Sequence, residues 1–250
     1  VPTPNKDAGS LISGGFQKIV TELGFNITFI PENLFLNGDY GQALQGEGIE
    51  VIHFPEVSRV EAYLKDNIDR FDLVYLVRHY PTGRFASLIK ELKPDLKIIF
   101  NTVDLHHIRE KRELEVMHPV SIPEKLLNEY EKSKANELNV MALTDATIVV
   151  SSAEKAYLEA VDPSLDVHCI PIPVKLTAAV ADRQFRKGIV FIGGFRHKPN
   201  LDAVRYFLKD IWPKVVELQP DMEFLIVGSE PPDEIISLKV KGVKVLGFVE

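Results

Sequence analysis

The fold is decided by the stretch Gly188-Ile-Val-Phe-Ile-Gly-Gly-Phe-Arg-His-Lys-Pro-Asn-Leu-Asp-Ala-Val-Arg-Tyr-Phe207. It opens on four apolar residues, 189–192, a short bounded run that predicts a strand buried on both faces of a parallel sheet. Two glycines then allow a sharp turn and a close approach of the backbone to a ligand. Apolar residues recur at helical spacing from Leu201 onward, so the predicted order is strand, glycine turn, basic cluster and helix.

The turn between this strand and this helix is the first candidate site. Its glycine, cationic and amide residues are Gly193, Gly194, Arg196, Lys198 and Asn200. A helix N-terminus presents unpaired backbone N–H groups and the positive end of the helix dipole, and both favour a phosphate group. The pattern therefore predicts either a diphosphate-binding turn for a nucleotide-type ligand or an ordinary strand-to-helix loop with a solvated basic rim. The residues alone favour neither.

Composition places the 250-residue chain among globular proteins of one large or two ordinary domains, with 45% apolar and 26% charged residues. A net charge of −7 argues against nucleic acid as a partner and against a general attraction to acidic membranes. The single cysteine, Cys169, excludes an intrachain disulfide and fits a reducing compartment. Its apolar neighbours predict a small buried side chain rather than a reactive thiol.

Apolar strands alternate with helical segments, which predicts an α/β fold of parallel sheets with helices on both faces. We expect a Rossmann-like domain over 1–173, a linker over 174–187, and a partial second Rossmann-like domain over 188–250. A parallel unit usually begins with a strand, and a second such domain normally has more than three strands. We therefore expect the chain to be a fragment that is truncated at both ends.

Ligands of open parallel sheets bind beyond the carboxyl ends of the strands. In the first half this rule selects Asp104 and His106 after one strand, and Arg78 and His79 after another. A histidine beside an aspartate favours a catalytic acid, a base or an orienter of hydroxyls. The alternative is a helix cap with half-buried histidines, and no metal is expected because no ligand set at a recognised spacing is complete. Arg78 fits a phosphate or carboxylate partner, or equally a plain ion pair.

The same rule selects loops nearer the two ends of the chain. Gly9 and Ser10 lie in a glycine-containing turn that admits a substrate, or in which Ser10 is a plain helix N-cap. A glycine at a strand end permits close approach of a ligand, a glutamate accepts hydrogen bonds from hydroxyls, and an aromatic residue stacks on a base or packs in the sheet. The strand-end residues in the second half are Gly228, Ser229, Glu230, Phe248 and Val249.

The order of these loops resembles that of the GT-B glycosyltransferases, specifically the retaining group 1 enzymes (family 4) of bacterial polysaccharide assembly. Motifs in the second half resemble their donor-binding domain, and motifs in the first half are similar to their acceptor-side domain. The second-half motifs are Phe191-Ile-Gly-Gly-Phe-Arg-His-Lys-Pro-Asn200, Pro220-Asp-Met-Glu-Phe-Leu-Ile-Val-Gly-Ser229 and Val243-Lys-Val-Leu-Gly-Phe-Val249. The first-half motifs are Asp7-Ala-Gly-Ser10, Phe71-Asp-Leu-Val74, Asn101-Thr-Val-Asp-Leu-His106 and Asp145-Ala-Thr-Ile-Val-Val-Ser151.

The resemblance implies a hexosyltransferase-type enzyme that moves a sugar from a nucleoside diphosphate sugar to a saccharide or lipid-linked acceptor. It implies retention of configuration, no cofactor and no obligatory metal. Lys198 matches the family's basic residue at the donor diphosphate, Gly193 and Gly194 match the turn that admits it, and His106 falls in a loop that faces the donor sugar. Gly194 stands where many members have an arginine, a role that would pass to Arg196.

Two further implications concern the parent protein. The family's two-glutamate motif would lie after Glu250, so the fragment itself is expected to bind donor poorly, and activity is assigned to a larger parent. The resemblance implies a cytoplasmic location, with peripheral association at the inner face of the membrane as one option. Two other functions stay open at this point: a nucleotide-sugar epimerase of the same architecture, and a non-catalytic nucleotide- or glycan-binding module.

Overall fold

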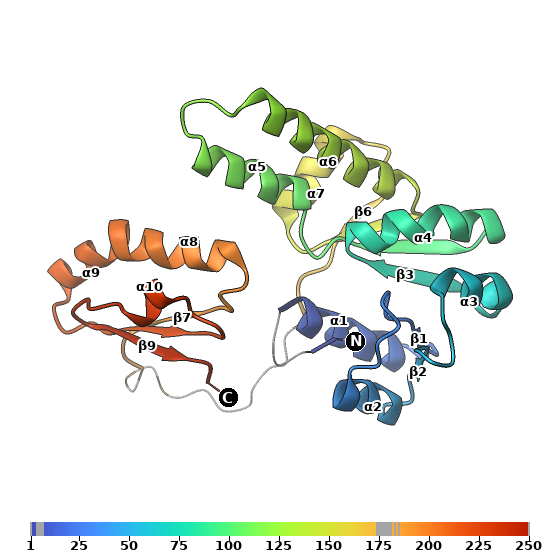
Figure 1. Cartoon of the computed structure of the whole chain (residues 1–250), viewed down its shortest axis with the longest axis horizontal. Coiled ribbons are helices and arrows are strands. Elements are labelled where there is room, and N and C mark those ends of the chain that lie inside the picture. Colours follow the sequence, from blue (N-terminus) through green and yellow to red (C-terminus); the bar gives the residue numbers. More distant parts are fainter. Residues whose placement is uncertain (1, 4–7, 174–181, 183, 185, 250) are drawn as a thin grey trace. The chain divides into compact units, whose positions relative to one another are not determined.

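The computed structural model describes residues 2–3, 8–173, 182, 184 and 186–249 (Figure 1). The chain divides into two compact units, one of residues 1–3 and 11–174 and the other of residues 4–10 and 175–250. Most of the predicted linker, 174–187, lies outside the described residues. Within each unit the strands pair in parallel, which confirms the predicted α/β, Rossmann-like class.

Helices and strands alternate through the first half of the chain. In order they are α1 (Ala8–Glu22), β1 (Thr28–Phe29), α2 (Gly38–Gly46), β2 (Glu50–Val51), α3 (Val60–Asn67), the short 3-10 helix η1 (Ile68–Arg70), β3 (Leu73–Val77), α4 (His79–Leu92), β4 (Lys97–Asn101), α5 (His106–Met117), α6 (Glu124–Ala142), β5 (Ala146–Val149), α7 (Ser152–Val161) and β6 (Val167–Cys169). β1 pairs only with β2, whereas β3, β4, β5 and β6 form a four-stranded sheet in that order.

Helices cover both faces of the four-stranded sheet (Figure 1). On one face, Ile12 and Phe16 of α1 pack against Ile148 of β5. On the other face, α4 to α7 bury the alternate strand residues, including Ile98 and Phe100 of β4, which are fully buried. This alternation follows from the pleat, which sends successive side chains of a strand to opposite faces.

The second unit contains β7 (Ile189–Ile192), α8 (Lys198–Tyr206), the π-helical turn η3 (Phe207–Ile211), α9 (Trp212–Leu218), β8 (Phe224–Val227), α10 (Asp233–Ile236) and β9 (Val243–Gly247). Its sheet runs β7-β8-β9 in parallel. The lone tryptophan, Trp212, is 2% exposed in a core with Phe207 and Phe224. The π-helical turn ends at Ile211, two residues before Pro213, whose ring lacks the N–H that an unbroken α-helix needs there.

Two burial predictions are wrong for one common reason. β7 was expected to be buried on both faces, yet Val190 is 53% and Ile192 75% exposed. Cys169 was expected to be buried and is exposed. β7 and β6 are the outer strands of their sheets as described, so each has a neighbour on one side only. Burial on both faces belongs to inner strands that helices cover, and strand order decides which strands those are.

Helix starts also differ from expectation. Ser10 lies inside the first turn of α1, which begins at Ala8, and is not the N-cap. α4 begins at His79 and α5 at His106, so both histidines lie in the first turn of a helix. α5 ends at Met117 and α6 begins after Pro123. Among the described residues, no helix combines the length and the apolarity that crossing a bilayer requires.

Asp145 joins three elements of the first unit through its carboxylate. It accepts hydrogen bonds from Lys90 Nζ (2.7 Å), Lys97 Nζ (2.9 Å) and the backbone N–H of Ile98 (2.9 Å). Although burial works in the opposite direction, these partners lower the pKa of Asp145 well below its usual range. A lowered pKa means that the carboxylate stabilises the fold above the unfolded value of about 3.9, and that this contribution is lost as the pH falls through the native value.

We therefore expect Asp145→Asn to lower the free energy of unfolding by about 1–3 kcal/mol at neutral pH, because charge-assisted hydrogen bonds are lost. The difference from wild type should shrink in acid, where the wild-type carboxylate is itself protonated. Urea unfolding at neutral and at acidic pH measures both effects. Asp72→Asn, at an exposed aspartate, is the matched control and should change little. If the difference in free energy of unfolding between Asp145→Asn and wild type did not shrink at acidic pH, this stabilising role of the Asp145 carboxylate would be contradicted.

Candidate functional site

The turn after β7 packs tightly on the turn after β8. The backbone N–H of Gly193 donates to Val227 O (3.0 Å), and that of Phe195 donates to Ser229 O (3.0 Å). A Cβ on Gly228 would lie 1.9 Å from Gly193 O, which is far inside van der Waals contact. Glycine is therefore required at position 228 so that the two strand-end turns can meet, and not because of an unusual φ angle.

Asn200 shapes the same turn from the start of α8. Its Nδ2 donates to Gly194 O (2.8 Å), and its backbone N–H donates to His197 O (2.9 Å). A Cβ on Gly193 would lie only 2.7 Å from Asn200 Nδ2, so the side-chain amide fills the space that glycine leaves. Lys198 is the first residue of α8, as predicted for the helix that follows the glycine turn.

Arg196 and Glu230 form an ion pair across the two turns. Arg196 Nε donates to Glu230 Oε2 at 2.5 Å, and this hydrogen bond raises the pKa of the guanidinium above its usual value. The side chains are 83% and 53% exposed, so the pair is strongly screened and contributes little to stability. The structure thus brings together the arginine predicted at the diphosphate and the glutamate predicted at the hydroxyls.

The third strand of this unit ends beside the other two. Gly228 N–H donates to Gly247 O (2.8 Å), so the carboxyl ends of β7, β8 and β9 meet at one edge of the sheet. Phe248 and Val249, predicted as the end of the last strand, follow it instead, and both are more than half exposed. The predicted donor-side residues of 193–200, 228–230 and 248–249 therefore belong to one connected edge of this unit.

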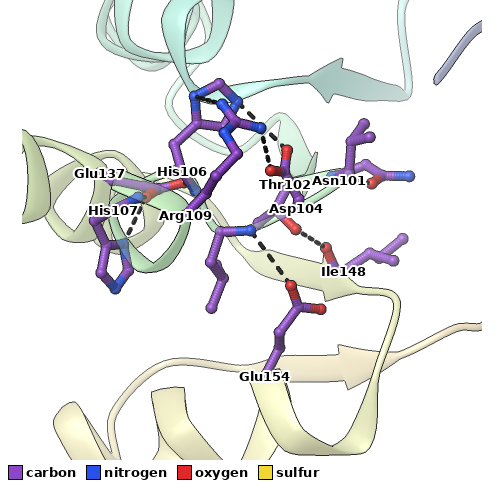
Figure 2. A network of polar contacts seen from close by, with 11 residues as sticks. Asn101, Thr102, Asp104, His106, His107, Arg109, Glu137, Ile148 and Glu154 are labelled. Atoms are coloured by element: carbon purple, nitrogen blue, oxygen red, sulfur yellow. Dashed lines mark hydrogen bonds and ion pairs between the residues drawn. The ribbon is translucent and has the colours of Figure 1, made fainter. Parts of the chain in front are cut away.

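A second cluster lies at the carboxyl end of β4 in the first unit (Figure 2). Arg109 donates to Asp104 Oδ2, and its Nη2 donates to His106 Nδ1 at 3.1 Å. His106 Nε2 lies 3.5 Å from Asp104 Oδ1. Because arginine can only donate, Nδ1 of His106 must be the acceptor, and the ring proton is on Nε2, which faces the carboxylate.

These contacts restrict the chemical roles that the His106 ring can have. Desolvation is the main cause that lowers the pKa of His106, and the positive charge of Arg109 acts in the same direction. The ring is therefore neutral at neutral pH. Its one lone pair is occupied by Arg109, so in this state the ring is a hydrogen-bond donor through Nε2–H rather than a ready base. Catalytic roles of His106 and Asp104 stay predictions.

Strained backbone marks the same edge of the sheet. Arg78 has φ 70° and ψ 147°, and Val103 has φ 66°, although neither is a glycine. A β-branched residue at positive φ is a genuine outlier, and such conformations occur at functional sites when the surroundings enforce them. Asn101 enforces both: its carbonyl accepts the N–H of Arg78 (2.9 Å), and its side-chain Oδ1 accepts the N–H of Val103 (2.9 Å).

His79 joins this cluster from the first turn of α4. Its ring stacks edge-on against the ring of His106, with centroids 4.4 Å apart. Of the predicted first-half residues, the structure therefore unites His79, Asp104 and His106, with Arg78 next to them in sequence. Gly9 and Ser10 lie in the first turn of α1. Among the described residues, no group of three or more histidine, cysteine, aspartate or glutamate side chains is placed to hold a metal ion.

Sequence reasoning missed Glu137, which holds the whole loop from behind. This carboxylate of α6 is 1% exposed and accepts hydrogen bonds from the backbone N–H groups of His106 (3.1 Å) and His107 (2.9 Å). It also accepts from His107 Nδ1 at 2.6 Å, and Tyr157 O–H donates to His107 Nε2 at 3.0 Å. Burial opposes the charge, but the donors of His107 and His106 outweigh it and lower the pKa of Glu137.

A second glutamate supports the loop from the opposite side (Figure 2). Glu154 Oε1 accepts from the backbone N–H of Leu105 (3.4 Å), and its Oε2 accepts from Ser151 Oγ (3.1 Å). The N–H of Glu154 in turn donates to Ser151 Oγ (3.2 Å), which caps α7. This serine-to-glutamate spacing of three is readable in the sequence as a helix cap, but its reach to Leu105 is not.

Comparison with known families gives one match. Residues 186–250 match the family model described as "Glycosyl transferases group 1". The matched segment contains β7, α8, β8 and β9 together with both packed turns, and it agrees with the resemblance expected for the second half. The similarity expected for the first half stays a prediction. No curated protein matches the chain.

Proposed function

We propose that the protein transfers a glycosyl group from a nucleoside diphosphate sugar to a saccharide or lipid-linked acceptor, with retention of configuration. The observation that carries the proposal is the coincidence of two findings in one segment. Residues 186–250 are similar to group 1 glycosyltransferases, and within them three strand ends meet at an edge that carries Arg196 and the start of α8. No cofactor enters the proposal, and the reaction needs no obligatory metal.

The chemistry needed in such a transfer is stabilisation of the departing diphosphate. Negative charge grows on the leaving oxygen as the bond to the sugar breaks, and preorganised cations and N–H groups favour that state. Arg196, Lys198 and the N-terminus of α8 are the groups proposed for this role. Glu230, now paired with Arg196, would be released to accept hydrogen bonds from ribose or sugar hydroxyls when phosphate takes the guanidinium.

In the first unit, Asp104 and His106 are proposed as the groups that face the reacting sugar. His106 offers a neutral Nε2–H donor, which orients a hydroxyl without adding charge. Arg78 and His79 are proposed on the acceptor side, because they follow the neighbouring strand β3 at the same sheet edge. The location proposed for the protein is the cytoplasm.

The test is calorimetric titration of the full-length protein that contains this chain with UDP, GDP and dTDP. We expect one of the three to bind, and Arg196→Ala and Lys198→Ala each to weaken its binding by about tenfold, or about 1.4 kcal/mol. The matched control is Arg205→Ala: Arg205 lies further along α8 and also pairs with an exposed glutamate, Glu234, at 2.5 Å. Its loss should leave binding unchanged.

Two outcomes would overturn the assignment. One is the absence of saturable binding for all three nucleotides. The other is an equal effect of Arg196→Ala and Arg205→Ala, which would mean that only general charge is sensed. Retention is tested separately, by following the anomeric proton of the product by NMR when the matching nucleotide sugar and a saccharide acceptor are supplied.

A further inference from the structure

A groove of about 350 Å³ runs between α4 and α6 of the first unit. This volume is within the range of about 300–1,000 Å³ that is usual for small-molecule sites. Gly83 of α4 lets the two helices approach, since a Cβ there would lie 3.1 Å from Val140 Cγ2. The side chains that the argument uses are His79, Tyr80 and Arg84 on α4 and Asn136 and Asn139 on α6.

The lining of the groove combines one aromatic surface with amides. Tyr80 is 72% exposed, so most of its ring is open to a ligand. Asn136 and Asn139 are exposed and stand three residues apart, which places them on the same side of α6. Each side-chain amide offers both donors and an acceptor. An aromatic face beside groups that donate and accept is complementary to a sugar ring, which presents C–H groups on its face and hydroxyls around its edge.

The groove carries little charge that is free to attract an anion. Arg84 is its only cationic lining residue, and its guanidinium is engaged by two carboxylates. Nε and Nη2 donate to Glu61 Oε1 at 3.0 and 2.7 Å, and Nη1 donates to Glu32 Oε1 at 3.4 Å. Because Arg84 pairs with two carboxylates, this position has no net positive charge. A neutral ligand is therefore favoured over a phosphate or a carboxylate.

One polar atom at the groove lacks a partner. His79 Nδ1 is shielded from solvent and makes no hydrogen bond within the described part of the chain. A shielded ring nitrogen without a partner is costly, but this atom is closed to water, so a ligand hydroxyl in the groove does not reach it in this conformation. The same ring stacks on His106 at 4.4 Å, so the groove ends beside the strand-end cluster of this unit.

We propose that the groove between α4 and α6 binds a neutral sugar residue of the acceptor. The ring stacks on Tyr80, and its hydroxyls bond to Asn136 and Asn139. The role of the groove as an acceptor site rests on the proposed glycosyl transfer. Its ability to bind a saccharide does not, and is tested without any donor and without any transfer reaction. A negative nucleotide titration therefore overturns the proposed function and leaves the groove to be judged by its own result.

The test is saturation-transfer difference NMR on the chain, with methyl α-D-glucopyranoside, methyl α-D-mannopyranoside and N-acetyl-D-glucosamine as probes and inorganic phosphate as the charged comparison. We expect saturation transfer to the ring protons of at least one sugar. In Tyr80→Ala, and in the double variant Asn136→Ala/Asn139→Ala, affinity should fall about tenfold or more. Octyl β-D-glucopyranoside below its micellar concentration distinguishes a lipid-linked from a free acceptor, since only the former predicts tighter binding of the octyl form.

Matched controls separate the groove from general surface effects. Tyr206→Ala removes another exposed tyrosine, on α8, and Asn128→Ala removes an exposed asparagine from α6 outside the groove. Both should bind the sugars as wild type does. All altered side chains are exposed, so the variants should fold, and thermal unfolding checks this. The proposal is overturned if no sugar receives saturation, if Tyr80→Ala and Tyr206→Ala behave alike, or if phosphate competes with the sugars in the groove.

Discussion

Glu137→Gln is expected to lower the free energy of unfolding by about 3 kcal/mol, the largest effect of any single side-chain charge in the first unit. Both oxygens of Glu137 accept N–H groups, and the residue is 1% exposed. A glutamine has the same shape but only one oxygen, so its NH₂ group would face another donor. A buried donor without an acceptor, together with the loss of the charge-assisted hydrogen bond from His107 Nδ1, costs about 3 kcal/mol.

The same substitution should act on His106, although Glu137 does not touch its ring. The carboxylate fixes the first turn of α5 by accepting the N–H groups of His106 and His107. Without it the turn loosens, and the ring of His106 gains access to water. Desolvation is the largest cause of the lowered pKa of His106, whereas the Glu137 charge, which raises that pKa, is the smallest; we therefore expect the pKa to rise toward its usual value when the turn loosens. A histidine NMR titration measures the change.

Two further variants serve as a control and a comparison for this prediction. Glu131→Gln alters an exposed glutamate of the same helix and should change neither stability nor the titration of His106. Tyr157→Phe removes only the hydroxyl that donates to His107 Nε2 and should cost about 1 kcal/mol. If Glu137→Gln is no more destabilising than Glu131→Gln, the carboxylate does not hold the loop. If stability falls while the titration of His106 stays the same, its role is structural and does not position His106.

The pH dependence of the Glu137 contribution has a definite sign. Its native pKa is lowered, so the carboxylate stabilises the fold above the unfolded value of about 4.3, and the contribution is lost as the pH falls through the native value. Asp145 acts in the same direction from another part of this unit. Both therefore contribute to an acid-induced loss of stability, which unfolding measurements on the two variants separate.

Sequence patterns predicted the secondary structure of single elements well. They failed where the burial of a residue depends on elements that are distant in sequence. The strand over 189–192 and the helix after it follow from apolar spacing, which acts within one element. Glu137 is one of several glutamates in a polar helix, and Glu129 and Glu131 beside it are exposed. Its burial depends on which face of α6 meets the start of α5, and that contact lies thirty residues away in sequence.

The candidate sites show the same division. Strand-end loops were selected by a rule about parallel sheets, and the structure does bring together 193–200 with 228–230, and Asp104 with His106 and His79. The strained φ angles of Arg78 and Val103 have no signature in residue type, because both residues normally avoid that region. Likewise, nothing in the sequence indicates that Arg196 pairs with Glu230, because this ion pair depends on how two turns pack.

Gly228→Ala is expected to destabilise the second unit by about 3 kcal/mol. The added Cβ would lie 1.9 Å from Gly193 O and 2.8 Å from Gly193 C, and both are backbone atoms that cannot rotate away. Overpacking of this kind typically costs about 1–3 kcal/mol, and backbone against backbone is at the upper end. Relief requires the turns to separate, which breaks the hydrogen bonds from Gly193 to Val227 and from Phe195 to Ser229.

Trp212 makes the measurement specific to this unit, because it is the only tryptophan of the chain and lies in the core with Phe224. Urea unfolding followed by its fluorescence reads the second unit directly. Gly46→Ala is the control: this glycine lies in the last turn of α2, in the first unit, with nothing within 4 Å of an added Cβ, so the transition followed by Trp212 should not change. Alanine is the better helix former, so this variant should be neutral or slightly stabilising.

Nucleotide binding should fall together with stability in Gly228→Ala, even though the substitution removes no charge. If the packed turns hold Arg196 and the start of α8 in place for a diphosphate, their separation weakens binding as Arg196→Ala does. Binding is measured in the absence of denaturant, where a loss of about 3 kcal/mol still leaves a unit of ordinary stability folded. A variant that unfolds more easily yet binds nucleotide as tightly as wild type would show that the packed turns serve the fold alone, and the diphosphate site would then have to be sought elsewhere on this edge.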